Sequence, residues 1–477
     1  MTTIQKASSL QDDHLVILCS SVSALSRYGL GHAEIDHVRN NFEKTDRKLV
    51  LFTGTGRHVY VLKKDKKDNP WKTVELIRKA GASTCTMLNE HKIKAVTIAD
   101  TDDRSEHLLA LAEGIALANY QFLKYKKNPD KEKNSLVSVS IFSKSVKPSA
   151  LSELTILSEA TTLARTLVNE PVSWLSAQQL SKEFEKLGKD AGFRVEIFNK
   201  AKIESLKMGG LLAVNKGSKQ PPTFTIMEYK HARARNKKPI VLVGKGVVYD
   251  TGGYNLKTGT GMETMKCDMA GAAAVGCTLY AIAKAKLPVH VIGLVPATDN
   301  RIDGDAYVAG DVLTMYDGTT VEMLNTDAEG RLILADALSW GEQYKPELVI
   351  DLATLTGAAV AAIGQHGIVS MGTAGDRVKN KLKTSGNATY ERLAEMPFWE
   401  EYDEMIKSDI AEIKNIGGPY GGSITAGKFL AWFVKSPWMH FDIAGPAFLP
   451  ARDGYRTKGG TGVGVRLLFD FLKNYSN

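Results

Sequence analysis

The sequence predicts an α/β protein with two unequal domains, and three observations support this fold class. The chain has 477 residues, whereas one domain usually holds roughly 100–200. Short apolar segments rich in β-branched residues alternate with helical patterns over most of the length. Several later segments are almost continuously apolar, which is typical of strands covered on both faces. The main sheet is therefore expected to be parallel or mixed, with helices flanking it.

The smaller N-terminal α/β domain is predicted over residues 1–148. Its strand candidates are His14–Cys19, Leu49–Phe52, His58–Leu62, Ala95–Ala99 and Val137–Phe142. A helix is expected over Glu106–Tyr125, and the charged stretch 124–133 after it is expected to be a solvated loop.

A connecting helix is predicted over residues 149–171. Leucine and isoleucine recur along it at helical spacing. Pro171 ends the helix, because proline lacks the amide hydrogen that the next helical hydrogen bond needs.

The larger C-terminal domain is predicted over residues 172–477, with a mixed sheet flanked by helices. Its helix candidates are Ser176–Leu187, Ala272–Lys286 and Leu332–Tyr344. Its strand candidates are Arg194–Phe198, Phe224–Glu228, Ile240–Val243, Val289–Val295 and Leu348–Leu352. The basic run 231–238 lies between two strands, so a surface loop is favoured there over a polyanion-binding patch.

Composition and charge exclude some classes of protein. The formal net charge of +8 is mild for this length, so it permits nucleic-acid binding without favouring it. Four scattered cysteines form neither a disulfide framework nor a thiolate zinc site, which favours a reducing compartment. The N-terminal segment has acidic residues where a signal peptide would be apolar, and no window is long and apolar enough for a membrane span. A cytoplasmic location is expected.

Four carboxylates stand beside predicted strand ends and helix starts, where open α/β sheets bind ligands. They are Asp250, Asp268, Asp327 and Glu329. Asp327 and Glu329 are two residues apart, which puts both side chains on one face of an extended segment. Two divalent cations would balance four negative charges, so the sequence favours a two-metal site. Lys245 could join it only as a neutral amine, since an ammonium group has no lone pair.

Each of these residues also has a simpler interpretation. A single aspartate after a strand is usually a turn or N-cap residue. Asp327 and Glu329 could cap the helix that follows them, and Lys245 alone could be a surface charge.

The segment NTDAEGRLILADAL, residues 325–338, resembles the signature of the leucyl aminopeptidase family of di-metal aminopeptidases. The segments GKGVVYDTGG, MKCDMAGAAA, DLATLTGA and FDIAGPA also resemble the family, in the same order along the chain. The resemblance covers the C-terminal domain, whereas the first 150 residues have little recognisable sequence. It implies a macro-like N-terminal domain and a C-terminal catalytic domain.

The resemblance also implies a role for each charged residue. Asp250 and Glu329 would bridge the two metals, Lys245 and Asp268 would complete one site, and Asp327 the other. Lys257 would polarise the scissile carbonyl, and Arg331 would hold a bicarbonate ion that acts as general base. The metals would be Mn²⁺ or Zn²⁺, with Co²⁺ or Mg²⁺ also possible.

The pocket for the first substrate side chain is expected to include six residues. They are Met265, Thr354, Leu355, Gly357, Ala444 and Ala447. A small Ala447 would favour bulky apolar side chains. The segment after Asp250 departs from the family pattern, with Tyr254-Asn255-Leu256-Lys257-Thr258 in place of the usual Ile-Ser-Ile-Lys-Pro.

The function expected from these features is a cytoplasmic, metal-dependent aminopeptidase that releases neutral, mainly apolar N-terminal residues such as leucine or methionine. The family implies a homohexamer of two stacked trimers. Two alternatives stay open: a dipeptidase with a narrow preference such as Cys-Gly, and an additional role in DNA binding.

Overall fold

The computed structural model describes residues 2–10, 14–45, 47–54, 56–65 and 67–475. The chain divides into two compact units. The first comprises residues 1–162 with 451–457, and the second comprises 163–450 with 458–477. The division falls within helix α5 (Pro148–Asn169). Among the described residues, no helix has both the length and the hydrophobicity that a membrane crossing needs.

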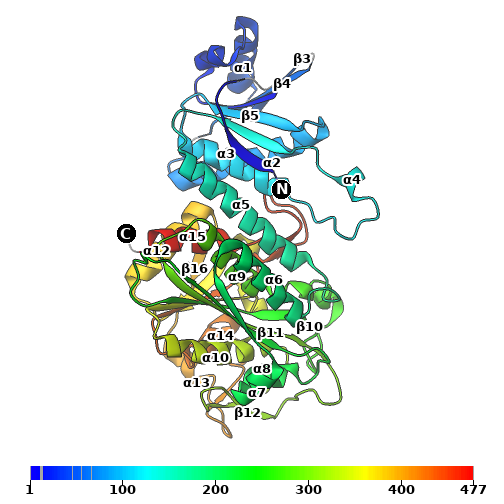
Figure 1. The fold of residues 1–477 in the computed structure, drawn as a ribbon, viewed down its shortest axis with the longest axis vertical. Helices are drawn as coiled ribbons and strands as arrows, with labels where there is room; N and C mark the ends of the chain where they lie inside the picture. The colour runs from blue at the N-terminus through cyan, green and yellow to red at the C-terminus, as the bar shows by residue number, and fades with distance from the viewer. Residues whose placement is uncertain (1, 11–13, 46, 55, 66, 476–477) are drawn as a thin grey trace. The chain divides into compact units, whose positions relative to one another are not determined.

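The first unit contains a six-stranded sheet in the order β1-β6-β5-β2-β4-β3 (Figure 1). All neighbouring strands are parallel except β3 and β4. The strands are β1 (Thr3–Ala7), β2 (His14–Cys19), β3 (Leu49–Gly54), β4 (Arg57–Lys63), β5 (Ala95–Asp100) and β6 (Ser138–Phe142). The helices are α1 (His32–Lys44), α2 (Pro70–Glu90), α3 (Ser105–Ala118) and α4 (Pro129–Glu132).

Alternation along β2 produces the two cores of this unit. Val16 and Leu18 share one hydrophobic cluster with α2 and α3, whereas Leu15 and Ile17 share the other with α1. Helix α3 ends at Ala118, seven residues earlier than its apolar pattern predicts. The next residue, Asn119, directs its side chain to Leu136 O and to Thr2 Oγ1, which fixes the turn away from the helix.

The second unit contains a nine-stranded mixed sheet in the order β16-β15-β18-β14-β9-β11-β8-β7, with β10 paired to β11. The strands of this sheet are β7 (Arg194–Phe198), β8 (Thr223–Lys230), β9 (Ile240–Gly244), β10 (Gly246–Asp250), β11 (His290–Asn300), β14 (Leu348–Ala353), β15 (Ile368–Gly372), β16 (Leu393–Glu395) and β18 (Trp438–Asp442). Strands β9 and β14 are buried along their whole length, as predicted for strands covered on both faces. Strand β18, which is not among the strands predicted from the sequence, is buried throughout as well.

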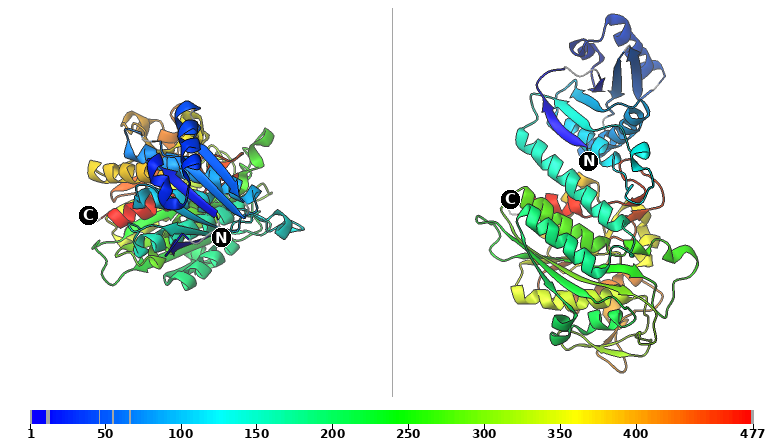
Figure 2. Two further views of the ribbon diagram at one scale, coloured as in Figure 1. Left: turned by 90° about the horizontal axis from the view of Figure 1, so that it is seen from above. Right: turned by 45° about the vertical axis from the view of Figure 1, so that its right-hand side comes forward.

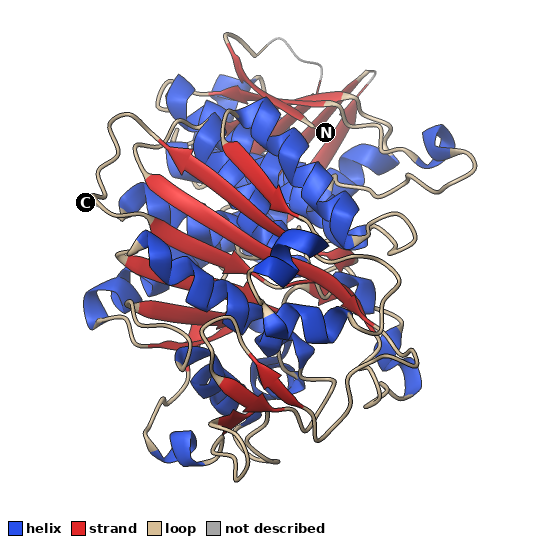
Figure 3. Ribbon diagram, turned by 60° about the horizontal axis from the view of Figure 1, so that its bottom comes forward, coloured by secondary structure: helices blue, strands red, loops and turns tan. Residues whose placement is uncertain are grey.

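Helices cover both faces of this sheet, as Figure 3 shows by colour and Figure 2 from two further sides. One layer includes α6, α9 and α15, which pack on one another, and the other includes α8, α10 and α14. The helices are α6 (Ala177–Ala191), α7 (Lys200–Ser205), α8 (Gly209–Asn215), α9 (Ala270–Lys284), α10 (Glu329–Gly341), α11 (Gly357–Ile363), α12 (Asp376–Thr389), α13 (Glu401–Glu404), α14 (Gly422–Ala431) and α15 (Val465–Asn474). Small sheets are formed by β12 (Val312–Thr314), β13 (Thr320–Glu322) and β17 (Ile413–Lys414), and by β19 (Phe448–Leu449) and β20 (Gly459–Gly460). The two-domain α/β fold predicted from the sequence is confirmed.

Candidate metal centre and active site

The structure brings three of the predicted carboxylates together at the carboxyl end of the second sheet. Asp250 is the last residue of β10, and Glu329 is the first residue of α10. One oxygen each from Asp250, Asp327 and Glu329 lies within 4.8 Å of the other two. Asp250 and Glu329 are 2% and 1% exposed, so two of the three negative charges are almost removed from water.

Asp327 and Glu329 do not meet through an extended segment, so that part of the prediction is wrong. Residues 325–328 form a turn, in which the Ala328 amide donates to Asn325 O. The Asp327 amide also donates to Asn325 Oδ1 at 2.8 Å, and this side-chain hydrogen bond stabilises the turn. The first turn of α10 then carries Glu329 back towards Asp250.

Lys245 lies at the centre of the buried group. Its Nζ atom is 2.9 Å from Asp268 Oδ1, 2.8 Å from Glu329 Oε1 and 2.9 Å from the carbonyl of Thr354. Burial disfavours the ammonium form, but Asp268, Glu329 and Asp250 outweigh it and raise the pKa of Lys245. Without cations, this lysine therefore holds its proton and compensates the carboxylates.

Lys257 lies between Asp250 and Asp327 and forms an ion pair with each. Its Nζ atom lies 2.8 Å from Asp250 Oδ2 and 2.5 Å from Asp327 Oδ1. Burial again opposes the charge, and the two carboxylates raise the pKa of Lys257 above its ordinary value. Its side chain is 18% exposed, so its ammonium group can reach the cavity.

The donor set fits divalent cations. Burial raises the pKa values of Asp268, Asp327 and Glu329, and neighbouring carboxylates raise them further. Asp268 Oδ2 and Glu329 Oε2 are buried and have no hydrogen-bond partner among the described residues. Each of these two oxygens has lone pairs but accepts no hydrogen bond. A divalent cation bound beside them would satisfy both.

Arg331 is a buried cation on α10. Its Nη1 atom donates to Asn415 O at 2.6 Å, whereas its Nε has no partner among the described residues. Burial lowers the pKa of Arg331 to about 10. Because no carboxylate of the described residues lies within ion-pair distance, this guanidinium is suited to an anion.

A cavity of about 410 Å³ opens over these charges. Five of the six residues predicted for the substrate pocket line it, namely Met265, Thr354, Leu355, Gly357 and Ala444. Ala447 does not line this cavity: it is 1% exposed, and its amide donates to Ile443 O. The cavity wall also includes Cys267, Val360, Ile416 and Gly422, none of which is predicted for the pocket from the sequence.

The structure adds one residue to the cluster that sequence reasoning missed. Asn300 is fully buried at the end of β11, and its Nδ2 donates to Asp250 Oδ1 at 2.8 Å. The same amide donates to Thr326 O at 3.0 Å and so connects Asp250 with the turn that carries Asp327. A polar residue at the end of an apolar strand was the available signal, but the predicted strand stopped at Val295.

The two basic runs lie on surface segments. Residues 231–238 form the loop between β8 and β9, and Asn236 fixes it by donating to His290 O at 2.8 Å. Residues 124–133 form an exposed segment that includes α4.

Comparison with known proteins identifies relatives of both units. A model of the cytosol aminopeptidase family, catalytic domain, matches residues 162–469, and a model of its N-terminal domain matches residues 41–129. A probable cytosol aminopeptidase of Chlorobaculum parvum is 53% identical over 316 residues, which are 66% of this chain and 62% of that protein. A probable cytosol aminopeptidase of Clostridium perfringens is 40% identical over 448 residues, which are 92% of this chain and 89% of that protein.

Two solved structures share the fold over nearly the whole chain. A mutant of tomato leucine aminopeptidase superimposes with a TM-score of 0.85 at 27% identity, covering 99% of this chain and 96% of that one. The bottromycin maturation enzyme BotP, in complex with Mn, also gives 0.85, at 28% identity with 98% and 100% coverage.

Proposed function

Since the chain belongs to the cytosol aminopeptidase family, we propose that it is a metal-dependent aminopeptidase that hydrolyses the N-terminal peptide bond of peptides. The observation that carries this proposal is the convergence of Asp250, Asp327 and Glu329 within 4.8 Å, beneath a cavity. Lys245 and Lys257 extend the group to Asp268 and into that cavity.

Five residues would hold two divalent cations, namely Lys245, Asp250, Asp268, Asp327 and Glu329. Two such cations lower the pKa of a bound water, which supplies a nucleophile near neutral pH. Lys245 must lose its proton to act as a ligand, so cation binding and proton release are coupled. Manganese and zinc are the two favoured metals, and the manganese in the BotP structure supports manganese.

Lys257 would place positive charge where the scissile carbonyl oxygen becomes negative. Its ammonium group lies beside Asp250 and Asp327, and its side chain lines the cavity, so its charge is available where the substrate would bind. Arg331 would hold bicarbonate, which would supply the general base, and its Nε, which finds no partner in the described part of the chain, supports this assignment. Recognition of a neutral α-amino group restricts hydrolysis to N-terminal bonds, because an internal peptide nitrogen lacks an available lone pair.

Neutral, mainly apolar N-terminal residues such as leucine or methionine are the proposed preference. Met265, Leu355, Val360 and Ile416 are apolar members of the cavity lining and support this preference. We also propose a cytoplasmic homohexamer of two trimers, which the family membership supports.

The test is hydrolysis of leucine p-nitroanilide by the metal-loaded protein and by Glu329→Gln. The variant keeps the shape of the side chain and removes its charge, so turnover should fall below detection while the circular dichroism spectrum is unchanged. Glu263→Gln, at an exposed glutamate, is the matched control. Undiminished turnover in Glu329→Gln would contradict the two-metal assignment. A panel of dipeptides and amino-acid amides would distinguish broad aminopeptidase activity from a narrow Cys-Gly dipeptidase.

A further inference from the structure

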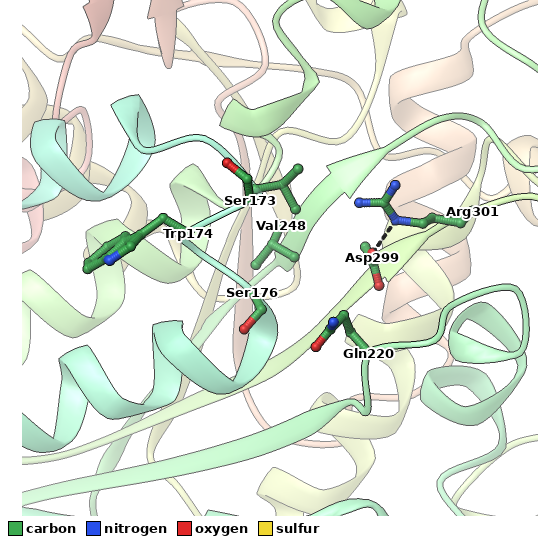
Figure 4. A pocket seen from close by; sticks show the side chains of 8 residues that line it. Ser173, Trp174, Ser176, Gln220, Val248, Asp299 and Arg301 are labelled. Atoms are coloured by element: carbon green, nitrogen blue, oxygen red, sulfur yellow. Dashed lines mark hydrogen bonds and ion pairs between the residues drawn. The ribbon is translucent and has the colours of Figure 1, made fainter. Parts of the chain in front are cut away.

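The second unit contains another cavity, which shares no lining residue with the one over the metal centre. Its volume is about 420 Å³, within the range of small-molecule sites. Figure 4 shows its walls, which come from the segment before α6, the turn before β8, and the edge formed by β10 and β11. The lining residues are Val172, Ser173, Trp174, Ser176, Gln220, Val248, Asp299 and Arg301.

Arg301 is held in a defined position at this cavity. Its Nε lies 2.5 Å from Asp299 Oδ2, and its Cζ lies 5.6 Å from the centre of the Tyr249 ring. The Asp299 side chain is 3% exposed, whereas that of Arg301 is 41% exposed. The two terminal nitrogens of Arg301 have no partner among the described residues. The guanidinium is thus anchored at one edge and free to bind at the other.

Three further side chains of the wall can each donate a hydrogen bond, beside the Asp299 carboxylate, whose buried Oδ1 has no partner among the described residues. The hydroxyl of Ser173 and the side-chain amide of Gln220 have no partner among the described residues. The Ser176 hydroxyl accepts from Gln179 N at 3.2 Å and keeps its own proton available. Arg301 can only donate, and the serine and glutamine side chains can donate beside it, so a ligand that presents acceptors without protons, such as a carboxylate or a phosphate, would satisfy them together.

The charge balance distinguishes these two acceptors. Asp299 already neutralises the charge of Arg301, so a doubly charged phosphate would bring two uncompensated negative charges into the cavity. A carboxylate carries half that charge. The side chains of Val172 and Val248 add an apolar surface to the same wall, which suits a ligand with an apolar body.

We propose that this cavity binds a small monocarboxylate with an apolar body. Its carboxylate is held by the terminal nitrogens of Arg301, with Ser173 and Gln220 as further donors, and its body lies against Val172 and Val248. This site is separate from the metal centre, and the proposal does not depend on the aminopeptidase assignment.

N-acetyl-L-leucine is a suitable probe, because it has a carboxylate and an isobutyl group but no free amine. Isothermal titration calorimetry of the metal-loaded, full-length protein should show saturable binding at one site per chain. N-acetyl-L-leucinamide, which lacks the carboxylate, should give no saturable heat. Arg301→Met should weaken binding at least tenfold, whereas Lys257→Met, in the other cavity, should leave it unchanged.

Arg301→Met leaves the buried Asp299 without its partner and could disturb folding. A second variant therefore tests the cavity without breaking this pair. Ser173→Val combined with Gln220→Leu keeps the Arg301–Asp299 pair and should weaken binding severalfold. Absence of saturable binding, equal binding of the amide, or equal competition by inorganic phosphate would each overturn the proposal. So would a loss of binding in Lys257→Met without a loss in the two variants of this cavity.

Discussion

The side chain of Lys245 passes so close to Gly330 that a Cβ atom at position 330 would lie 2.4 Å from Cε of the lysine and 2.6 Å from its Nζ. Both distances are shorter than any ordinary contact between non-bonded atoms. The lysine follows this path to reach Glu329 and Asp268 at 2.8 and 2.9 Å. Glycine at position 330 is therefore required for the lysine to enter the carboxylate cluster.

Gly330→Ala is expected to displace Lys245 and to disrupt the metal centre. Overpacking of a buried site costs about 1–3 kcal/mol in the free energy of unfolding. Leucine p-nitroanilide turnover and metal content should both fall, as measured with the purified protein. Gly304→Ala is the matched control, because a Cβ atom there meets no other atom within 4 Å. Full metal content and turnover in Gly330→Ala would show that the lysine is not needed where the structure places it.

Asn300→Ala is expected to weaken metal binding. The amide of Asn300 fixes one oxygen of Asp250 at 2.8 Å, so its removal frees a proposed ligand to rotate. Loss of such a supporting hydrogen bond typically reduces metal affinity about 10–100-fold. Competition with a chelator measures this dissociation constant without reference to activity. Asn380→Ala, at an exposed helical position, is the control. An unchanged dissociation constant in Asn300→Ala would contradict the positioning role.

Lys257→Met is expected to lower kcat while both metals stay bound. An interaction made mainly in the transition state contributes about 10²–10³-fold to kcat. KM should change much less, and metal analysis should give the wild-type stoichiometry. Lys219→Met, at an exposed lysine, controls for loss of charge alone. If the fall in turnover were matched by a fall in metal content, Lys257 would be a structural counter-ion of Asp250 and Asp327 instead.

The residues of the cluster could be predicted from the sequence because their chemistry depends on residue type. The carboxylates stand at strand ends and helix starts, and these positions meet at one edge of any parallel sheet. How they meet could not be predicted. The turn at 325–328 depends on a hydrogen bond that the Asn325 side chain accepts from the Asp327 amide, which no hydrophobic pattern reveals.

Ala447 and Asn300 show the same limit from opposite directions. The position of Ala447 in a motif predicts that it lines the substrate pocket. The residue type does not show which way so short a side chain points, and in the structure Ala447 is only 1% exposed. Asn300 was missed because its partner, Asp250, is 50 residues away in sequence. Contacts between separate strands become visible only when the sheet order is known.

His440 and Asp351 form a buried pair that should make stability depend on pH. They are directly opposite each other on the parallel strands β18 and β14, and His440 Nδ1 lies 2.6 Å from Asp351 Oδ1. Trp438 donates to the other carboxylate oxygen at 2.7 Å. Burial alone would lower the pKa of His440, but Asp351 outweighs it and raises the pKa above the ordinary value of 6.5.

The folded protein therefore binds the proton of His440 more tightly than the unfolded chain does. This contribution to stability is complete below the unfolded pKa of about 6.5 and is lost as the pH rises through the folded pKa. Urea unfolding from about pH 6 to about pH 9 should show a decline in the free energy of unfolding for the wild type. His440→Gln should be less stable at the acidic end and should show a smaller decline. His37→Gln, at an exposed histidine, should keep the wild-type slope, and an equal slope in His440→Gln would assign the decline to other groups.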